Sequence, residues 1–164
     1  MKRIVTLTVL TVLLLSLTAC GLLKETTYIE DNISITLPAG FWEQEESDFD
    51  AMYMSLNYFV AYQTESFEDY REAGVDPAKV SQEQYAEVSF SSLDSAVEPY
   101  TSDGMTCTEY TAETEEGTSR YLVVARKLEG AFVTAQFGCT EDRFEELKPE
   151  FLACAKTLTY TNED

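Results

Sequence analysis

A cysteine follows directly on an apolar run near the start of the chain. The run covers residues 4–17, and Lys2 and Arg3 precede it. The sequence Leu17-Thr18-Ala19-Cys20 closes it. A short basic segment, an apolar segment of this length and small residues after it are the features of a secretory signal peptide. We therefore expect residues 1–19 to be a removable signal.

The sequence around this cysteine resembles the bacterial lipobox, whose cysteine thiol is diacylated before the chain is cleaved on its amino side. The resemblance implies that cleavage falls between Ala19 and Cys20 and that Cys20 becomes a lipid-bearing N-terminus. Two acyl chains hold a protein on a bilayer stably, because each buried methylene contributes about 0.8 kcal/mol. We expect a lipoprotein on the extracytoplasmic face of the cell membrane.

The alternative for this segment is an uncleaved transmembrane anchor. Residues 4–23 carry no charge, and the stretch is long enough to span a bilayer. The position of Cys20 immediately after the small residues favours lipidation. Residues 20–26 would then form a tether, and the six residues after the cysteine reach about 20 Å when fully extended. We expect the domain to lie close to the membrane.

The chain contains no histidine. This excludes Ser-His-Asp and Cys-His catalysis and imidazole proton shuttles. Carboxylate pairs occur at Glu45-Glu46, Glu115-Glu116 and Glu145-Glu146, where we expect solvated charge. A weak divalent-cation site in Glu43–Asp50 and a hydrolase that uses carboxylates alone are the alternatives. We expect no enzyme, no cofactor and no resident metal.

Three cysteines follow Cys20, so at least one of them is free or pairs between chains. The expected elements place Cys107 and Cys139 on strands separated by another strand. They also place Cys139 and Cys154 too far apart for a bridge. Cys107–Cys154 is the least implausible pair, and the simpler interpretation is three small core residues.

Negative charge dominates the chain after the signal. All 30 acidic residues lie there, with 9 basic ones, for a net charge of −21. Nucleic acid and anionic lipid head groups would be repelled by such a surface. We expect no nucleic-acid binding, and we expect any protein partner that uses this charge to be basic.

The expected strands alternate apolar and polar residues between turn signals. They cover 27–30, 33–37, 51–56, 58–64, 105–113, 119–128 and 131–139, with a last edge strand at 157–160 and a frayed tail at 161–164. The turn at Glu129-Gly130 pairs Leu128 with Ala131. One face then carries Leu122, Val124, Leu128, Ala131, Ala135 and Phe137, and the other carries Tyr121, Val123, Ala125 and Phe132. Neither face is polar throughout, which indicates a sheet covered on both sides. Phe41, Trp42 and the tyrosines are expected in the core, and a ligand cleft lined by these side chains is the alternative.

Capping residues and apolar spacing predict the helices. Ser66 caps a short helix over 67–73, and a capping box of Ser81 and Gln84 opens a helix over 82–94. The apolar stripe of this second helix consists of Ala86, Phe90, Leu93 and Val97. A helical turn after Thr140 and a separate helix that begins at Pro149 are expected near the C-terminus, because proline inside a helix costs about 3 kcal/mol.

Two stretches resemble the PsbP-like family, which shares its fold with the Mog-type Ran-binding proteins. They are Ile33-Ser-Ile-Thr-Leu-Pro-Ala-Gly-Phe-Trp42 and Lys148-Pro-Glu-Phe151. The order of elements agrees over about 28–160. The resemblance implies one domain, 27–160, of α+β class, an α/β/α sandwich whose mostly antiparallel sheet is flanked by helices on both faces. The resemblance also implies a role in binding or assembly rather than catalysis. It assigns no functional residues to this chain.

The leading hypothesis is therefore a membrane-anchored, extracytoplasmic protein-binding or scaffold module. The alternative is a lipoprotein that binds a small ligand or a divalent cation in association with transport. One short domain without a hinge argues against the alternative. The sequence identifies neither the partner nor the ligand.

Overall fold

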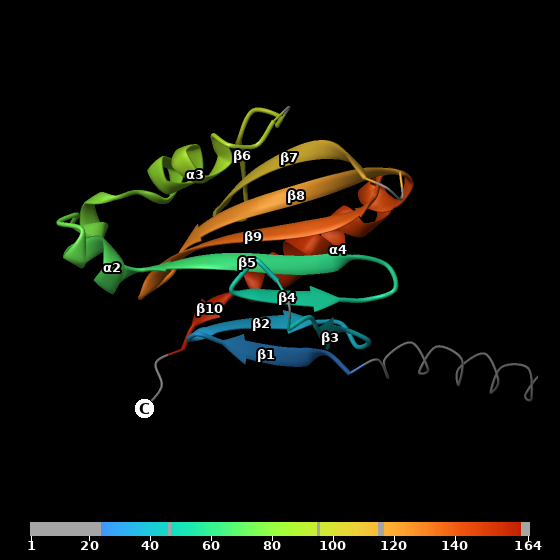
Figure 1. The fold of residues 1–164 in the computed structure, drawn as a ribbon, viewed down its shortest axis with the longest axis horizontal. Coiled ribbons are helices and arrows are strands. Elements are labelled where there is room, and N and C mark those ends of the chain that lie inside the picture. Colours follow the sequence, from blue (N-terminus) through green and yellow to red (C-terminus); the bar gives the residue numbers. More distant parts are fainter. Residues whose placement is uncertain (1–23, 46, 95, 115–116, 162–164) are drawn as a thin grey trace, which may run out of the picture.

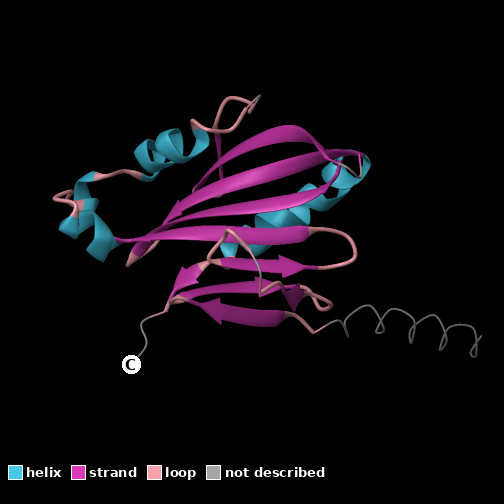
Figure 2. Cartoon of the chain, viewed as in Figure 1, coloured by secondary structure: helices cyan, strands magenta, loops and turns pink. Residues whose placement is uncertain are grey.

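The computed structural model describes residues 24–45, 47–94, 96–114 and 117–161. The expected signal, the lipobox and Cys20 lie outside these residues, as do three residues of the expected tail. Ten strands and three α-helices, with two short 3-10 helices, form the described part (Figures 1 and 2). Among the described residues there is no helix of the length and hydrophobicity that crossing a membrane requires.

The strands form two antiparallel sheets. The larger sheet has seven strands in the order β3-β4-β5-β9-β8-β7-β6, and the smaller has three in the order β1-β2-β10. Their bounds are β1 Thr26–Glu30, β2 Ile33–Leu37, β3 Trp42–Glu43, β4 Ala51–Met54, β5 Phe59–Ser66, β6 Tyr100–Ser102, β7 Met105–Thr114, β8 Gly117–Lys127, β9 Ala131–Thr140 and β10 Thr159–Tyr160.

Two tight turns show why the sequence forms these hairpins. Asp31 and Asn32 join β1 to β2, both with positive φ (47° and 65°), which the expected hairpin requires and which Asp and Asn tolerate. Asp103 and Gly104 join β6 to β7 in the same way, with φ of 51° and 78°. The sequence analysis did not predict β6, although Asp-Gly before an alternating run is a hairpin signal.

Helices cover both faces of the seven-stranded sheet, which confirms the expected α+β sandwich. Helices α2 (Phe67–Glu72) and α3 (Gln82–Phe90) lie on one face. Helix α4 (Phe144–Lys156) lies on the other, where it shares the outer layer with the three-stranded sheet. The second sheet in this layer was not foreseen.

The two faces predicted for β8 and β9 are confirmed. Leu122, Val124, Ala135 and Phe137 belong to the core under α4. Val123, Ala125 and Phe132 belong to the smaller core under α3. The backbone N–H of Leu128 donates to Ala131 at 2.8 Å, as the Glu129-Gly130 turn predicts.

The predicted break at Pro149 is wrong. One helix, α4, runs through the proline, after a 3-10 turn at Glu141–Arg143. Phe144 and Phe151 lie on either side of the proline, and both are fully buried against the sheet. Burial of a large side chain contributes about 1.5–3 kcal/mol, so two of them in one continuous helix offset the lost hydrogen bond.

Helix α3 ends earlier than the apolar spacing predicts. Its capping box is present, but the helix stops at Phe90, and Tyr85, Ala86 and Phe90 are its buried residues. Val97 does not continue the stripe. Its N–H donates to the backbone carbonyl oxygen of Glu109, and its carbonyl oxygen accepts from the side-chain hydroxyl of Thr108, both on β7. Its side chain is 49% exposed. Backbone pairing along the sheet edge therefore determines the position of Val97.

The side chain of Arg126 ties the end of α4 to the sheet. Its Nη1 donates to the carbonyl oxygens of Ala155, Lys156 and Leu158 at 3.0, 3.0 and 2.8 Å. The last carbonyls of a helix have no partner within the helix and carry partial negative charge. The guanidinium of Arg126, on β8, donates hydrogen bonds to these carbonyl oxygens and places a positive charge beside them.

Replacing Arg126 by methionine should lower the free energy of unfolding by about 2 kcal/mol, because a hydrogen bond from a charged group contributes ~1.5–3 kcal/mol. Methionine keeps the apolar stem. Urea unfolding followed by circular dichroism measures the loss. Lys79→Met is the control, since the Lys79 side chain is 82% exposed and reaches only Asp76 at 3.6 Å. An equal effect of both substitutions would contradict the role of Arg126.

The three described cysteines carry free, buried thiols. Cys107 and Cys154 lie in the same core but are not bridged. Strand β8 separates Cys107 from Cys139, as expected. Burial raises the pKa of Cys107 and of Cys154 to about 11 and also raises that of Cys139. Thiols with raised pKa values are poor nucleophiles at neutral pH, so these side chains serve packing.

Candidate functional site

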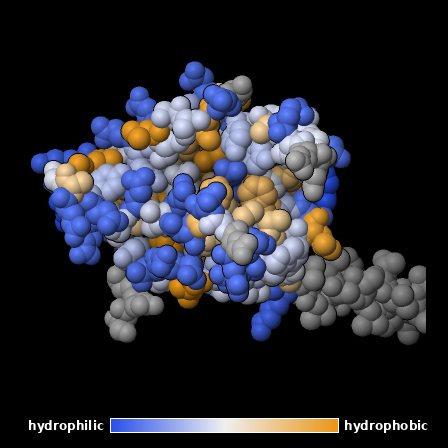
Figure 3. Space-filling view, viewed as in Figure 1, coloured by the Kyte–Doolittle hydropathy of each residue, from blue (hydrophilic) through white to orange (hydrophobic). Residues whose placement is uncertain are grey.

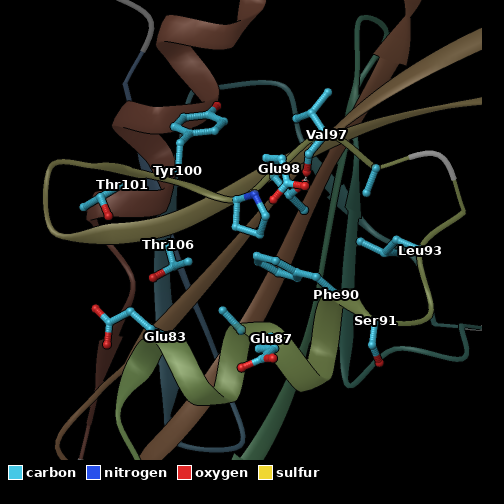
Figure 4. A pocket seen from close by; sticks show the side chains of 14 residues that line it. Glu83, Glu87, Phe90, Ser91, Leu93, Val97, Glu98, Tyr100, Thr101 and Thr106 are labelled. Carbon is cyan, nitrogen blue, oxygen red and sulfur yellow. Dashed lines mark hydrogen bonds between the residues drawn. The ribbon is translucent and has the colours of Figure 1, made fainter.

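A groove of about 670 Å³ lies between α3 and the sheet edge formed by β6 and β7 (Figure 4). Its lining includes four apolar residues that we call its apolar floor, namely Ala86, Phe90, Leu93 and Val97. Glu83 and Glu87 of α3 lie along one side, and Glu98 lies on the opposite wall. Among the described residues that line the groove there is no lysine or arginine, so the charged side chains of its lining are all acidic.

Two local structures hold the walls of the groove apart. The capping box fixes the start of α3, where the hydroxyl of Ser81 accepts from the N–H of Gln84 at 3.2 Å. On the other wall, the hydroxyl of Thr108 donates to the carbonyl oxygen of Val97 at 2.7 Å. After α3 the chain returns to the sheet as the edge strand β6. The groove is the space between the helix and this edge, beside Phe90.

Helix-terminal hydrogen bonds keep the first carboxylate of the groove charged. Its own backbone N–H and the Ser81 hydroxyl lower the pKa of Glu83. Three carboxylates over an apolar floor suit a ligand that carries both positive charge and apolar carbon. Arginine and lysine side chains have this composition.

A second cluster of charged side chains lies under α4, on the other face of the sheet. The carboxylate of Glu109 is only 7% exposed and accepts from Lys148 Nζ at 2.6 Å, Arg120 Nη2 at 2.7 Å and the Tyr100 hydroxyl at 2.8 Å. Burial raises the pKa of Glu109, but these three hydrogen bonds outweigh burial, and the net shift is downward. Two cationic side chains and one hydroxyl thus share this buried carboxylate. We therefore assign the cluster to stability.

Several residues that the sequence singled out lie elsewhere. Phe41 packs against the core and meets Tyr58 edge-on at 4.9 Å, as expected, but Trp42 is 47% exposed, so its predicted burial is wrong. Glu145 and Glu146 are solvated, with 71% and 74% exposed side chains. Among the described residues, including 43–45 and 47–50, no group of three acidic or cysteine side chains could hold a metal ion.

Neither the groove nor the cluster around Glu109 was predicted from the sequence. The groove joins a helix to an edge strand that was not predicted. The cluster joins β6, β7, β8 and α4, and Lys148 is 39 positions from Glu109. The Asp103-Gly104 turn is the one sequence signal that could have indicated β6. Because β6 borders the groove, it would also have indicated one of the groove's walls.

No family model matches the chain, and no curated protein matches it in sequence. Cyanobacterial PsbP (CyanoP) from Synechocystis sp. PCC 6803 has a similar solved structure. The TM-score is 0.50 at 12% identity, over 85% of this chain and 94% of that chain. A protein from Bacteroides thetaiotaomicron VPI-5482 gives a TM-score of 0.52 at 12% identity, over 85% of this chain and 49% of that chain.

This chain therefore spans about half the length of the Bacteroides protein. Identity of 12% shows the fold alone. The PsbP-like fold that the sequence resemblance implied is confirmed.

Proposed function

We propose that this PsbP-like domain is a non-catalytic protein-binding module held on the extracytoplasmic face of the cell membrane by lipid on Cys20. The observation that carries the binding role is the groove beside α3, with its apolar floor and three carboxylates. The sequence Leu17-Thr18-Ala19-Cys20 after the apolar run supports the anchor. The partner that suits the groove is a basic protein segment.

The arrangement of the strands supports this role. The groove borders β6, which is one edge of the seven-stranded sheet, and β3 is the other edge. The chain enters through β1, and β2 then leads to β3. The groove therefore lies on the far side of the molecule from the chain entry (Figure 1). A partner could reach it while the anchor is in the bilayer.

A photo-crosslinking amino acid at Val97 tests this proposal in native membranes. Val97 is 49% exposed in the groove, and we expect it to crosslink to a protein through a lysine- or arginine-rich segment identified by mass spectrometry. The double substitution Glu83→Lys, Glu87→Lys reverses charge on exposed positions and should remove most of the crosslink.

Ile29 provides the matched control, because it is 61% exposed on β1, away from the groove. The crosslinker at Ile29 should not capture the same partner. Equal capture from both positions, or capture at Val97 that charge reversal leaves unchanged, would contradict the proposed site.

A small ligand is the second candidate for the same groove, because its volume lies within the ~300–1,000 Å³ typical of ligand pockets. An organic cation with an apolar part would match the lining. Binding of such a compound would raise the melting temperature with its concentration. This rise should disappear in the charge-reversed variant.

A further inference from the structure

The end of the domain at which the chain enters also carries exposed apolar side chains. Thr26, the first residue of β1, pairs with Leu37 at the end of β2. Five residues later Trp42 pairs with Met54, and the β4–β5 turn follows. Figure 1 shows the start of β1 and this turn at the same end of the molecule.

Leu56, at the tip of the β4–β5 turn, is 95% exposed. The turn is well ordered, because the Ser55 hydroxyl donates to the Tyr58 carbonyl oxygen at 2.8 Å and the Tyr58 N–H donates to this hydroxyl at 3.2 Å. A leucine held rigidly in water gains nothing for the fold of the isolated domain. Its exposed position makes it available to contact an apolar surface.

Trp42 adds a second side chain to this end. It is 47% exposed at the edge of the large sheet, and it is the only tryptophan in the chain. Tryptophan concentrates at membrane–water interfaces, where the ring is apolar and its N–H stays hydrated. In Figure 3, apolar areas lie among hydrophilic ones on the face seen there, so exposed apolar side chains are not confined to one place.

We propose that Leu56 and Trp42 rest on the lipid surface and orient the anchored domain. This inference depends on the proposed lipidation of Cys20. The short chain before β1 identifies the occupant as the lipid surface, because the six residues 20–25 reach only about 20 Å at full extension. The end that carries Leu56 and Trp42 is therefore the part of the domain nearest the bilayer, and α3, which borders the groove, lies away from this end (Figure 1).

Charge around the turn limits how deeply this end enters. The Arg143 guanidinium donates to the Asn57 side chain at 2.8 Å and pairs with Glu146 at 3.4 Å. Glu141 and Asp142 precede Arg143, and Glu43 follows Trp42 in β3. The acidic surroundings favour a shallow contact with net-neutral head groups, and anionic lipids should weaken it.

Fluorescence of the single tryptophan tests this contact without a label. The lipidated full-length protein is reconstituted into phosphatidylcholine vesicles, and its emission is compared with and without lipids brominated near the head-group end of the acyl chains. We expect brominated lipid to quench Trp42 and aqueous acrylamide to quench it weakly. Leu56→Asp should remove most of the bromine quenching, and phosphatidylglycerol vesicles at low salt should reduce it.

Val75→Asp is the matched control, because Val75 is 42% exposed beyond α2, at the opposite end of the domain. Brominated lipid should quench Trp42 in this variant as strongly as it does in the protein of unmodified sequence. Protein that floats with the vesicles but shows no bromine quenching would overturn this inference and leave the anchor intact. Protein that does not float would overturn both. Protection from acrylamide in native membranes alone would point to a protein as the occupant.

Discussion

Replacing Cys20 by serine should abolish lipidation and leave no diacylated product. The lipobox resemblance makes the thiol of Cys20 the acceptor, and serine offers no thiol. Mass spectrometry of the membrane-derived protein measures the result directly. The unmodified sequence should give a mature chain that begins at Cys20 and carries the mass of its acyl chains. The variant should lack that mass and be poorly retained.

Cys107→Ser is the control for this experiment, because Cys107 is a buried thiol on β7. Its product should keep the lipid and the same N-terminus. An unmodified sequence that keeps residues 1–19, or that begins at a position other than Cys20, would contradict the anchor. An intact leader would favour the alternative of a transmembrane segment over 4–23.

Replacing Glu109 by glutamine should lower the free energy of unfolding by about 3 kcal/mol, the lower end of the range for breaking a buried ion pair. Glutamine has nearly the same size as glutamate but carries no charge. The hydrogens of its amide group would also face the donor groups of Lys148, Arg120 and Tyr100. Lys148 and Arg120 would lose their shared acceptor, although both are partly hydrated, with 27% and 29% of their side chains exposed. Urea unfolding at neutral pH measures the difference.

Glu145→Gln is the matched control. Glu145 also pairs with Arg120, at 2.9 Å, but its side chain is 71% exposed. An exposed pair contributes about 0–1 kcal/mol. A loss for Glu109→Gln that is no larger than the loss for Glu145→Gln would show that the buried cluster does not stabilise the fold.

The effect of Glu109 should also depend on pH. Its folded-state pKa lies below the usual 4.5, so the folded state holds the charged form more strongly than the unfolded chain does. The resulting stabilisation is fully present above the unfolded pKa and is lost as the pH falls through the folded pKa. The difference between the unmodified protein and Glu109→Gln should be constant near neutrality and decrease below about 4.5. Unfolding curves at several pH values measure it.

The sheets were largely predictable because their signals are local. Alternating residues determine which side of a strand is buried, and the Asp31-Asn32 and Glu129-Gly130 turns fix the register. These rules gave both faces of β8 and β9. They failed at Trp42, because alternation distinguishes two faces but does not show whether another element covers either of them.

The errors in the helices arose where local and tertiary energies compete. Proline disfavours a helix interior, yet α4 continues through Pro149 and buries both Phe144 and Phe151. Spacing alone extended α3 to Asp94 and its apolar stripe to Val97, but the helix ends at Phe90, and hydrogen bonds to β7 determine the position of Val97. The groove and the cluster around Glu109 depend on contacts between distant segments, which residue periodicity does not encode.

The last strand pairs with the second strand, and this has a consequence for export. Thr159 of β10 lies opposite Ser34 of β2, and the Thr161 N–H donates to the Asn32 carbonyl oxygen at 2.7 Å. The three-stranded sheet therefore cannot be completed until the final residues of the chain are available. Contacts of such long sequence separation form slowly. In the exported protein proposed above, this sheet should therefore be completed only after residues 159–161 have also crossed the membrane.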